Sequence, residues 1–247
     1  MVWGGKLWRA QTRPRVHHQL NLQTMTPQTK DLHGFFIQPK NTGANCLENQ
    51  IHPKHYILLL VNSLLLLAFG SRFILQLNYE FVIYVSVILV FGLLITASFK
   101  TIGYKFETLV GLTIWSGMHL AGGGIPVGDG RLYDIILLPL SGSMPIFRYD
   151  QLVHIVGFGA ATLAMHDLLA FNNDTKATSL TISYSIALLM AGLGVGAFNE
   201  TVEFLVNCVV PESGVGGYVN TSLDLCSNFI GALLALVYLS LKAKASG

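Results

Sequence analysis

The chain has 247 residues, of which 52% are hydrophobic and only 11% are charged. A soluble globular domain carries about 25% charged residues, so this composition, with a mean hydropathy of +0.54, excludes an ordinary soluble domain and indicates an integral membrane protein. The formal net charge is only +2, which does not favour nucleic acid as a partner.

Residues 1–55 are polar and contain seven lysine and arginine residues, without the apolar core of a secretory signal. We predict that this segment is a basic, poorly ordered extension on the cytoplasmic side of the membrane. Met25 is an alternative start of the protein, in which case residues 1–24 would not belong to it.

The remainder, residues 56–242, contains six apolar runs, and a membrane-spanning helix needs about 20 such residues. We therefore predict an all-α, polytopic membrane helix bundle of about six transmembrane helices. The predicted spans are residues 56–71, 79–99, 107–125, 150–170, 178–208 and 224–241. A further stretch, residues 132–147, is apolar but short and contains two prolines, so we predict a re-entrant or interfacial segment there.

The basic residues are unevenly distributed between the two predicted sides of the membrane. Cytoplasmic loops carry an excess of lysine and arginine. The N-terminal extension, the connections after the second and fourth spans, and the C-terminus hold most of the basic residues, whereas the residues 209–223 hold none. This pattern predicts six spans with both termini in the cytoplasm.

Ionisable residues recur near the outer end of four predicted spans. Three of these spans carry polar residues in pairs spaced three or four positions apart, which places each pair on one face of its helix. At about 1.5 Å rise per residue, all of them fall within about 12 Å of the outer boundary. A charge facing lipid costs about 2.5–3.5 kcal/mol, so we predict that they face one another inside the bundle. The predicted cluster consists of His119, Asp150, His154, Glu200, Glu203, Asp224 and Asn228.

Four motifs contain these residues: MHLAGG at 118–123, FRYDQLVHIVGFG at 147–159, ETVEF at 200–204 and DLCSNFIGALL at 224–234. With these motifs, the chain resembles the YjdF-like inner-membrane proteins, a family of unknown function. The last three are similar, at longer distance, to motifs of the VanZ-like membrane proteins. The resemblance covers roughly residues 56–241 and implies a multi-pass protein of the bacterial inner membrane; it implies no catalytic residues.

The residue types of the cluster suit a divalent metal such as Zn, Mn or Fe, and helix bundles build carboxylate-rich metal sites from facing helices. The predicted ligands are His119, Asp150, His154, Glu200, Glu203 and Asp224. In a metal-dependent enzyme acting on a lipid or lipid-linked substrate, the predicted catalytic groups are Glu200, Glu203 and His154. Neither Glu-x-x-His nor His-Glu-x-x-His is present. The metal prediction therefore rests on the residue types that the helices bring together and not on a known metal-binding motif.

Arg148 and Tyr149 lie at the predicted outer interface, and with Asn228 they are the predicted substrate-binding residues. The favoured function is binding of a lipid headgroup or a metal, with membrane lipids as partners. A metal-dependent enzyme and a proton-coupled transporter are the alternatives, as is a polar network that only holds the helices together. The inner halves of the last three spans offer little polar path, which disfavours transport.

Two cysteines and three glycines in the last two spans also have alternative interpretations. Cys208 and Cys226 fall near the outer face, where a disulfide could form, but we favour two buried thiols. The glycines at 192, 194 and 196 resemble part of a dinucleotide-binding pattern, but no strand precedes them, so we predict close helix packing.

Overall fold

The computed structural model describes residues 51–139, 147–172, 180–210 and 213–245. The chain divides into two units, Met1–Asn45 and Cys46–Gly247, and every described residue belongs to the second. The predicted extension up to residue 50, with the alternative start at Met25, therefore lies outside the described residues.

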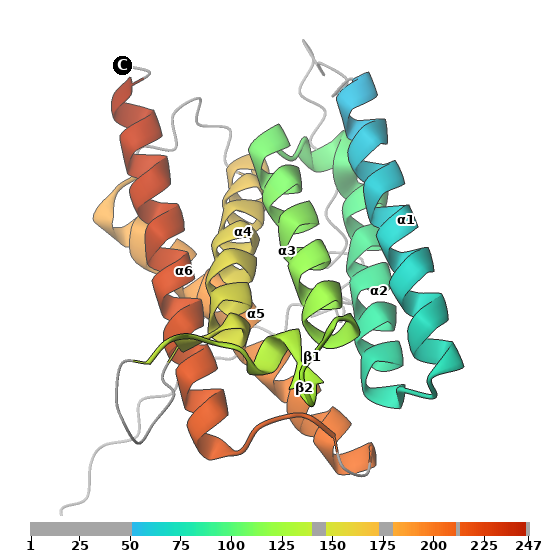
Figure 1. The fold of residues 1–247 in the computed structure, drawn as a ribbon. Helices are drawn as coiled ribbons and strands as arrows, with labels where there is room; N and C mark the ends of the chain where they lie inside the picture. The colour runs from blue at the N-terminus through green and yellow to red at the C-terminus, as the bar shows by residue number, and fades with distance from the viewer. Residues whose placement is uncertain (1–50, 140–146, 173–179, 211–212, 246–247) are drawn as a thin grey trace, which may run out of the picture. The chain divides into compact units, whose positions relative to one another are not determined.

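Six α-helices form the described unit, as Figure 1 shows, and confirm the all-α membrane bundle. They are α1 (Pro53–Leu75), α2 (Tyr79–Ile102), α3 (Phe106–Gly124), α4 (Tyr149–Asn172), α5 (Ile182–Val209) and α6 (Tyr218–Ala245). Within the described ranges, five of them are long and apolar enough to cross a membrane; α3 is the exception. This helix packs against α1 on one side and α4 on the other, and the polar side chains of Thr108 and Ser116 are buried there.

Short strands connect α3 to α4. β1 (Pro126–Val127) pairs with β2 (Gly130–Arg131) through a turn in which Gly128 has a φ of +55°, a backbone conformation that glycine adopts readily. A 3₁₀ turn, η2 (Leu132–Asp134), leads to β3 (Ile136–Leu138), which pairs with β4 (Phe147–Arg148). The described part of the predicted re-entrant stretch thus contains no α-helix, and its depth in the membrane stays a prediction.

Several helices begin or end a few residues away from the predicted spans, whose bounds in the membrane stay a prediction. α1 begins at Pro53 and continues past Arg72, because a basic side chain in the last turn of a helix interacts favourably with the helix dipole. α6 begins at Tyr218 rather than at residue 224, since the amide of Asn220 donates to the carboxylate of Asp224 (2.6 Å) and is satisfied within the helix. α5 begins at Ile182, after a capping residue, Thr181.

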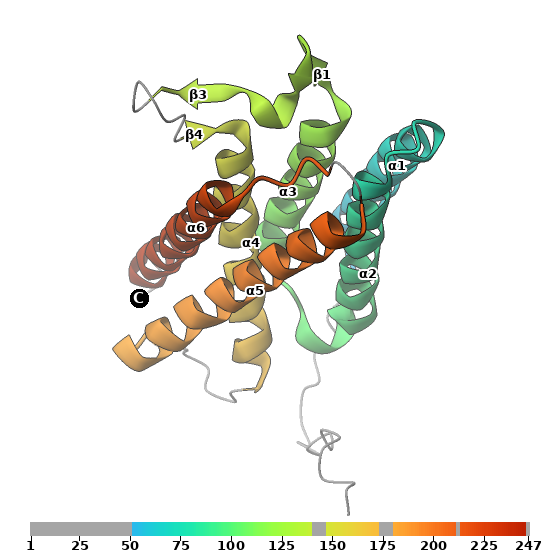
Figure 2. The same ribbon diagram turned by 90° about the horizontal axis from the view of Figure 1, so that it is seen from below.

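The start of α1 and the end of α6 lie at the same end of the bundle, and β1 and β2 lie at the opposite end (Figure 1). Figure 2, a view turned by 90°, shows α5 crossing obliquely between α6 and α2. The first and last helices thus have their outer ends on one side of the bundle, and the cytoplasmic location of the chain termini stays a prediction.

Glycines allow α4, α5 and α6 to approach closely, as predicted for two of the three glycines in α5. A Cβ atom at Gly192 would lie 2.2 Å from the Thr162 hydroxyl, and one at Gly196 would lie 2.8 Å from the Asn228 amide nitrogen. The prediction is wrong for Gly194, which has nothing within 4 Å of that position. Close approach through small residues is typical of membrane helix pairs.

The two described cysteines differ from the prediction of buried thiols. Both Cys208 and Cys226 are exposed, and neither forms a disulfide. Each side chain therefore lies on a largely uncovered face of its helix.

A second polar cluster lies at the end of α4 opposite to Asp150, where the sequence predicts little polarity. Asp167 is buried and accepts hydrogen bonds from the Lys105 backbone N–H (3.0 Å) and the Thr108 hydroxyl (2.7 Å), at the start of α3. His166 Nδ1 and the Tyr184 hydroxyl are 2.9 Å apart. Asp167 thus caps the start of α3, and His166 joins α4 to α5.

We expect Asp167→Ala to lower the free energy of unfolding by about 1–3 kcal/mol, because the Thr108 hydroxyl and the Lys105 N–H lose their acceptor. Thermal unfolding of the purified chain measures this loss. Asp129→Ala, which removes an exposed aspartate between β1 and β2, is the control and should change stability by less than about 0.5 kcal/mol. Equal losses in both variants would contradict the capping role.

Candidate functional site

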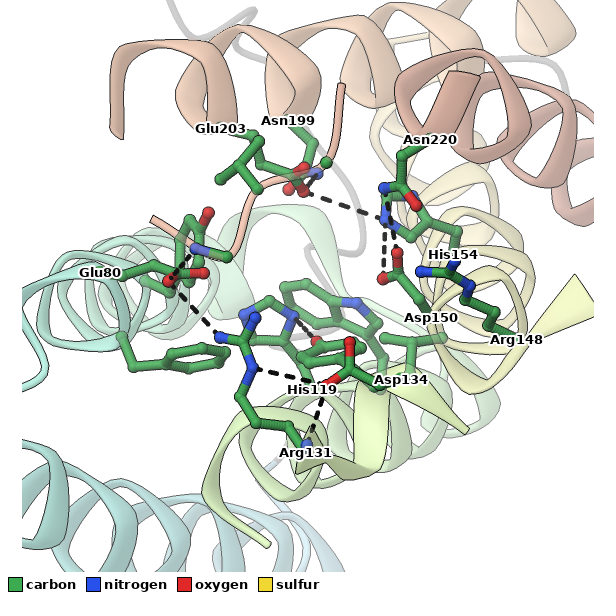
Figure 3. A pocket seen from close by; sticks show the side chains of 18 of the residues that line it. Glu80, His119, Arg131, Asp134, Arg148, Asp150, His154, Asn199, Glu203 and Asn220 are labelled. Atoms are coloured by element: carbon green, nitrogen blue, oxygen red, sulfur yellow. Dashed lines mark hydrogen bonds and ion pairs between the residues drawn. The ribbon is translucent and has the colours of Figure 1, made fainter. Parts of the chain in front are cut away.

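A cavity of about 80 Å³ lies at the strand-bearing end of the bundle. Side chains from α2, α3, α4, α5 and α6 line it, together with residues of the strands and of the segment before α6 (Figure 3). One water needs about 10–15 Å³ of such space, so the cavity has room for several water-sized polar groups.

His154 lies at the centre of a group of carboxylates beside this cavity. Its Nε2 atom is 3.7 Å from Asp150 Oδ1, 3.9 Å from Glu203 Oε1 and 3.9 Å from Asp224 Oδ1. Its Nδ1 atom is 3.7 Å from Glu200 Oε1. None of these distances is short enough for a hydrogen bond, so the histidine faces four carboxylates without bonding directly to any of them.

Glu200 is the member of this group whose surroundings are least satisfied. Its side chain is only 9% exposed, and neither carboxylate oxygen has a hydrogen-bond partner among the described residues. A buried carboxylate without a partner is costly. Among the described residues, the group nearest to Glu200 with opposite charge character is the His154 imidazole, at 3.7 Å, which is too far for a hydrogen bond.

Amide side chains hold the other carboxylates in place. Gln151, which is buried, donates to Asp224 Oδ1 (2.7 Å), and Asn220 donates to the other oxygen of the same carboxylate (2.6 Å). Asn199 donates to Glu203 Oε1 (2.7 Å) from the preceding turn of α5. These contacts fix the carboxylates around His154, as such outer contacts do around metal ligands.

Asn228 contacts His154 from behind the cavity. Its Oδ1 atom is 2.9 Å from His154 Nδ1, and the side chain is completely buried. Asn228 does not line the cavity. The structure therefore places this predicted substrate-binding residue where it orients the imidazole.

The structure does not bring His119 into the group around His154. In the described chain, two groups of residues have possible metal-binding atoms that all lie within 4.8 Å of one another. The first group is Asp150, His154 and Asp224, and the second is His154, Glu200 and Glu203.

The imidazole of His119 bonds instead to the connection between α3 and α4. Its Nδ1 atom is 2.6 Å from the Tyr133 hydroxyl, and the rings of Phe81, Tyr84 and Trp115 lie around it. Burial raises the pKa of the Tyr133 phenol well above its ordinary value, so the hydroxyl keeps its proton and forms a neutral hydrogen bond with Nδ1. This interaction packs His119 against the wall of the cavity.

Glu80, in the first turn of α2, also belongs to the site, although it is not among the residues predicted from the sequence. Glu80 is buried, accepts a hydrogen bond from the Gly214 backbone N–H (2.8 Å) and lies 3.5 Å from Arg131 Nη1. It thus joins α2 to β2 and to the segment before α6 on one side of the cavity (Figure 3). An acidic residue in the outer turn of an apolar span is a signal that could have found it.

Arg148 and Tyr149, the other predicted substrate-binding residues, have different surroundings. The Tyr149 hydroxyl donates to the Met118 carbonyl (3.2 Å), tying α4 to α3, and Tyr149 does not line the cavity. Arg148 does line it. Within the described residues, the Arg148 guanidinium has no hydrogen bond or ion pair.

Negative charge predominates in and directly behind the cavity. Six carboxylates face two arginines there, and one of these, Arg131, lies within 4.0 Å of both Glu80 and Asp134. The six are Glu80, Asp134, Asp150, Glu200, Glu203 and Asp224. Apart from the imidazole of His154, the carboxylates around it have no lysine or arginine ion pair within the described residues.

A model of the family described as "Predicted membrane protein (DUF2238)" matches residues 56–245. The chain belongs to this family. The match includes every residue of the His154 group, and it confirms the resemblance to an uncharacterised YjdF-like membrane family. The similarity to VanZ-like proteins stays a prediction. No curated protein and no solved structure matches the chain.

Proposed function

We propose that this member of the DUF2238 family is a multi-pass protein of the bacterial inner membrane that binds a divalent metal ion at one end of its helix bundle. The metal ligands are His154 and carboxylates from the set Asp150, Glu200, Glu203 and Asp224. The observation that supports this proposal most directly is the four carboxylate oxygens at 3.7–3.9 Å from the nitrogens of one imidazole.

The spacing of these atoms suits an ion better than direct hydrogen bonds. A charge-assisted bond from imidazole to carboxylate is about 2.7–2.9 Å long. Ligand atoms bound to one tetrahedral ion at about 2.1 Å are about 3.4 Å apart. The observed separations from His154 Nε2 to Asp150 Oδ1 and Asp224 Oδ1 therefore need to contract by only about 0.3–0.5 Å.

The charge of the site supports the same proposal. Several carboxylates held together in a low-dielectric interior repel one another unless a cation offsets them. Glu200 has the clearest need for a cation, because it is buried and neither of its oxygens has a hydrogen-bond partner in the described ranges. An imidazole with several carboxylates is a donor set that Zn, Mn and Fe all accept.

A second candidate function is that of a metal-dependent hydrolase or transferase. It is supported by the position of His154 and its surrounding carboxylates beside the cavity. Asp150, His154 and Glu203 all line it, which would leave one side of a bound ion open to a water molecule. A metal-bound water is a nucleophile near neutral pH, and Glu203 could accept its proton. The substrate would be a lipid or a lipid-linked compound at the membrane surface.

Elemental analysis tests the proposal. We expect the purified full chain, after incubation with Zn²⁺, Mn²⁺ or Fe²⁺ and removal of excess ion, to retain about one ion per chain. Glu203→Gln should bind that ion at least about tenfold more weakly, because the charged ligand is lost. Glu107→Gln changes a carboxylate at the start of α3 that contacts Lys242 and should leave the metal content unchanged. A wild-type chain that retains none of the three ions would contradict the proposal.

A further inference from the structure

The structure points to a ligand for Arg148: we infer that this residue binds a phosphate group next to the metal ion. The inference rests on the proposed function and names the chemistry of the group that would enter the cavity. Two sources carry this chemistry, a lipid headgroup and free inorganic phosphate, and both present the same anionic oxygens to a guanidinium.

The backbone of Arg148 is fixed on two sides. As part of β4, it pairs with Ile136 of β3, and its backbone N–H donates to the Gln151 side chain (2.9 Å) in the first turn of α4. Gln151 is the same residue that holds Asp224. The backbone position of Arg148 is thus tied to the carboxylates around His154.

Of the two arginines that line the cavity in the described chain, Arg148 is the one whose guanidinium has no ion pair. Arg131 already lies near two carboxylates and over the ring of Phe81 (5.7 Å), whereas Arg148 has neither kind of contact within the described ranges. In Figure 3, Arg148 lies on the side of the cavity where Asp150, His154 and Asn220 also lie.

A phosphate group is suited, in its charge and in the arrangement of its oxygens, to the guanidinium of Arg148 and to the proposed metal ion. A guanidinium presents paired N–H donors that match two phosphate oxygens, and a divalent ion binds a further oxygen and offsets the remaining charge. Without the ion, the carboxylates around His154 would repel a phosphate. A phosphate held by both Arg148 and the ion would therefore depend on the metal.

Phosphate binding to the full chain loaded with Mn²⁺ tests this inference, with inorganic phosphate and phosphatidic acid in detergent micelles as the two probes. Calorimetry gives the affinity, and broadening of the ³¹P signal reports phosphorus close to the paramagnetic ion. We expect Arg148→Gln to weaken binding at least about tenfold, since a charge-assisted contact is lost. Arg148→Lys should fall between it and wild type, because the charge remains and the paired donors do not.

Arg72→Gln is the matched control, because Arg72 is exposed in the last turn of α1, outside the cavity. This variant should bind both probes as wild type does. Binding of phosphatidic acid alone would assign a lipid headgroup as the source, and binding of both probes would show that a free phosphate suffices; either result supports the inference provided that Arg148→Gln weakens it.

The failures of the two proposals are distinguishable. A chain that retains Mn²⁺ but binds neither probe, or whose Arg148→Gln and Arg72→Gln variants bind equally well, overturns this inference and leaves the metal site standing. A wild-type chain that retains no Mn²⁺, Zn²⁺ or Fe²⁺ overturns the proposed function and this inference together. Arg148→Gln should retain Mn²⁺ as wild type does, which also shows that the variant is folded.

Discussion

Replacing His154 by alanine is expected to abolish metal binding by the purified chain. His154 is the only residue present in both sets of candidate ligands in the described chain, so its loss removes the imidazole that all four carboxylates face. Loss of an outer contact around a metal ligand already costs about 10–100-fold in affinity, so loss of the ligand itself should exceed about 100-fold. The measurement is the ion content per chain at increasing metal concentration.

His166→Ala provides the matched control for this prediction. His166 lies on the same helix, is equally buried, and bonds to the Tyr184 hydroxyl at the opposite end of α4. It should lower stability by removing a buried hydrogen bond and leave metal binding intact. If both histidine variants retained the ion, or if both lost it, the assignment of the metal to His154 would be wrong.

The largest effect on stability is expected from Gly231→Ala, at the contact between α4 and α6. The added Cβ would lie 2.3 Å from the backbone carbonyl oxygen of Ile155 and 2.9 Å from the backbone nitrogen of Gly159. Backbone atoms cannot move aside as a flexible side chain can, so the two helices must separate. We expect a loss of about 1–3 kcal/mol or more, measured as a lower midpoint of thermal unfolding.

Gly194→Ala separates this effect from the general consequence of adding a methyl group to a helix. Gly194 lies inside α5, and nothing lies within 4 Å of the position of its added Cβ, so this variant should not lower the midpoint. Since α4 and α6 carry His154 and Asp224, Gly231→Ala should also weaken metal binding. Equal midpoints for the two alanine variants would contradict the close approach of α4 and α6.

The sequence predicted the helices, and it predicted that the polar residues lie at the same end of several of them. Both predictions have a physical reason. Uninterrupted apolar runs specify helices in a membrane, and pairs such as Asp150 and His154 lie on one face because the helix period requires it. Four spans with polar residues at one end therefore indicate a common site. The structure brings the members on α4, α5 and α6 together.

The remaining features depend on contacts that local spacing does not specify. His119 occupies the expected level, but the turn that carries Tyr133 provides a closer partner for it. Asp167 caps a different helix, α3, so its role depends on the packing of α3 against α4. The exposure of Cys208 likewise depends on which face of α5 its neighbours cover. Such pairings are set by tertiary structure, and a single sequence indicates them only weakly.

X-ray absorption spectroscopy of the metal-loaded full chain tests the central claim most directly, because it reports the atoms bound to the ion. The proposed site predicts one imidazole nitrogen and carboxylate oxygens at about 2.0–2.2 Å, with the imidazole contribution present in wild type and in His166→Ala and absent in His154→Ala. A sulfur ligand at about 2.3 Å, or an imidazole contribution that persists in His154→Ala, would contradict it.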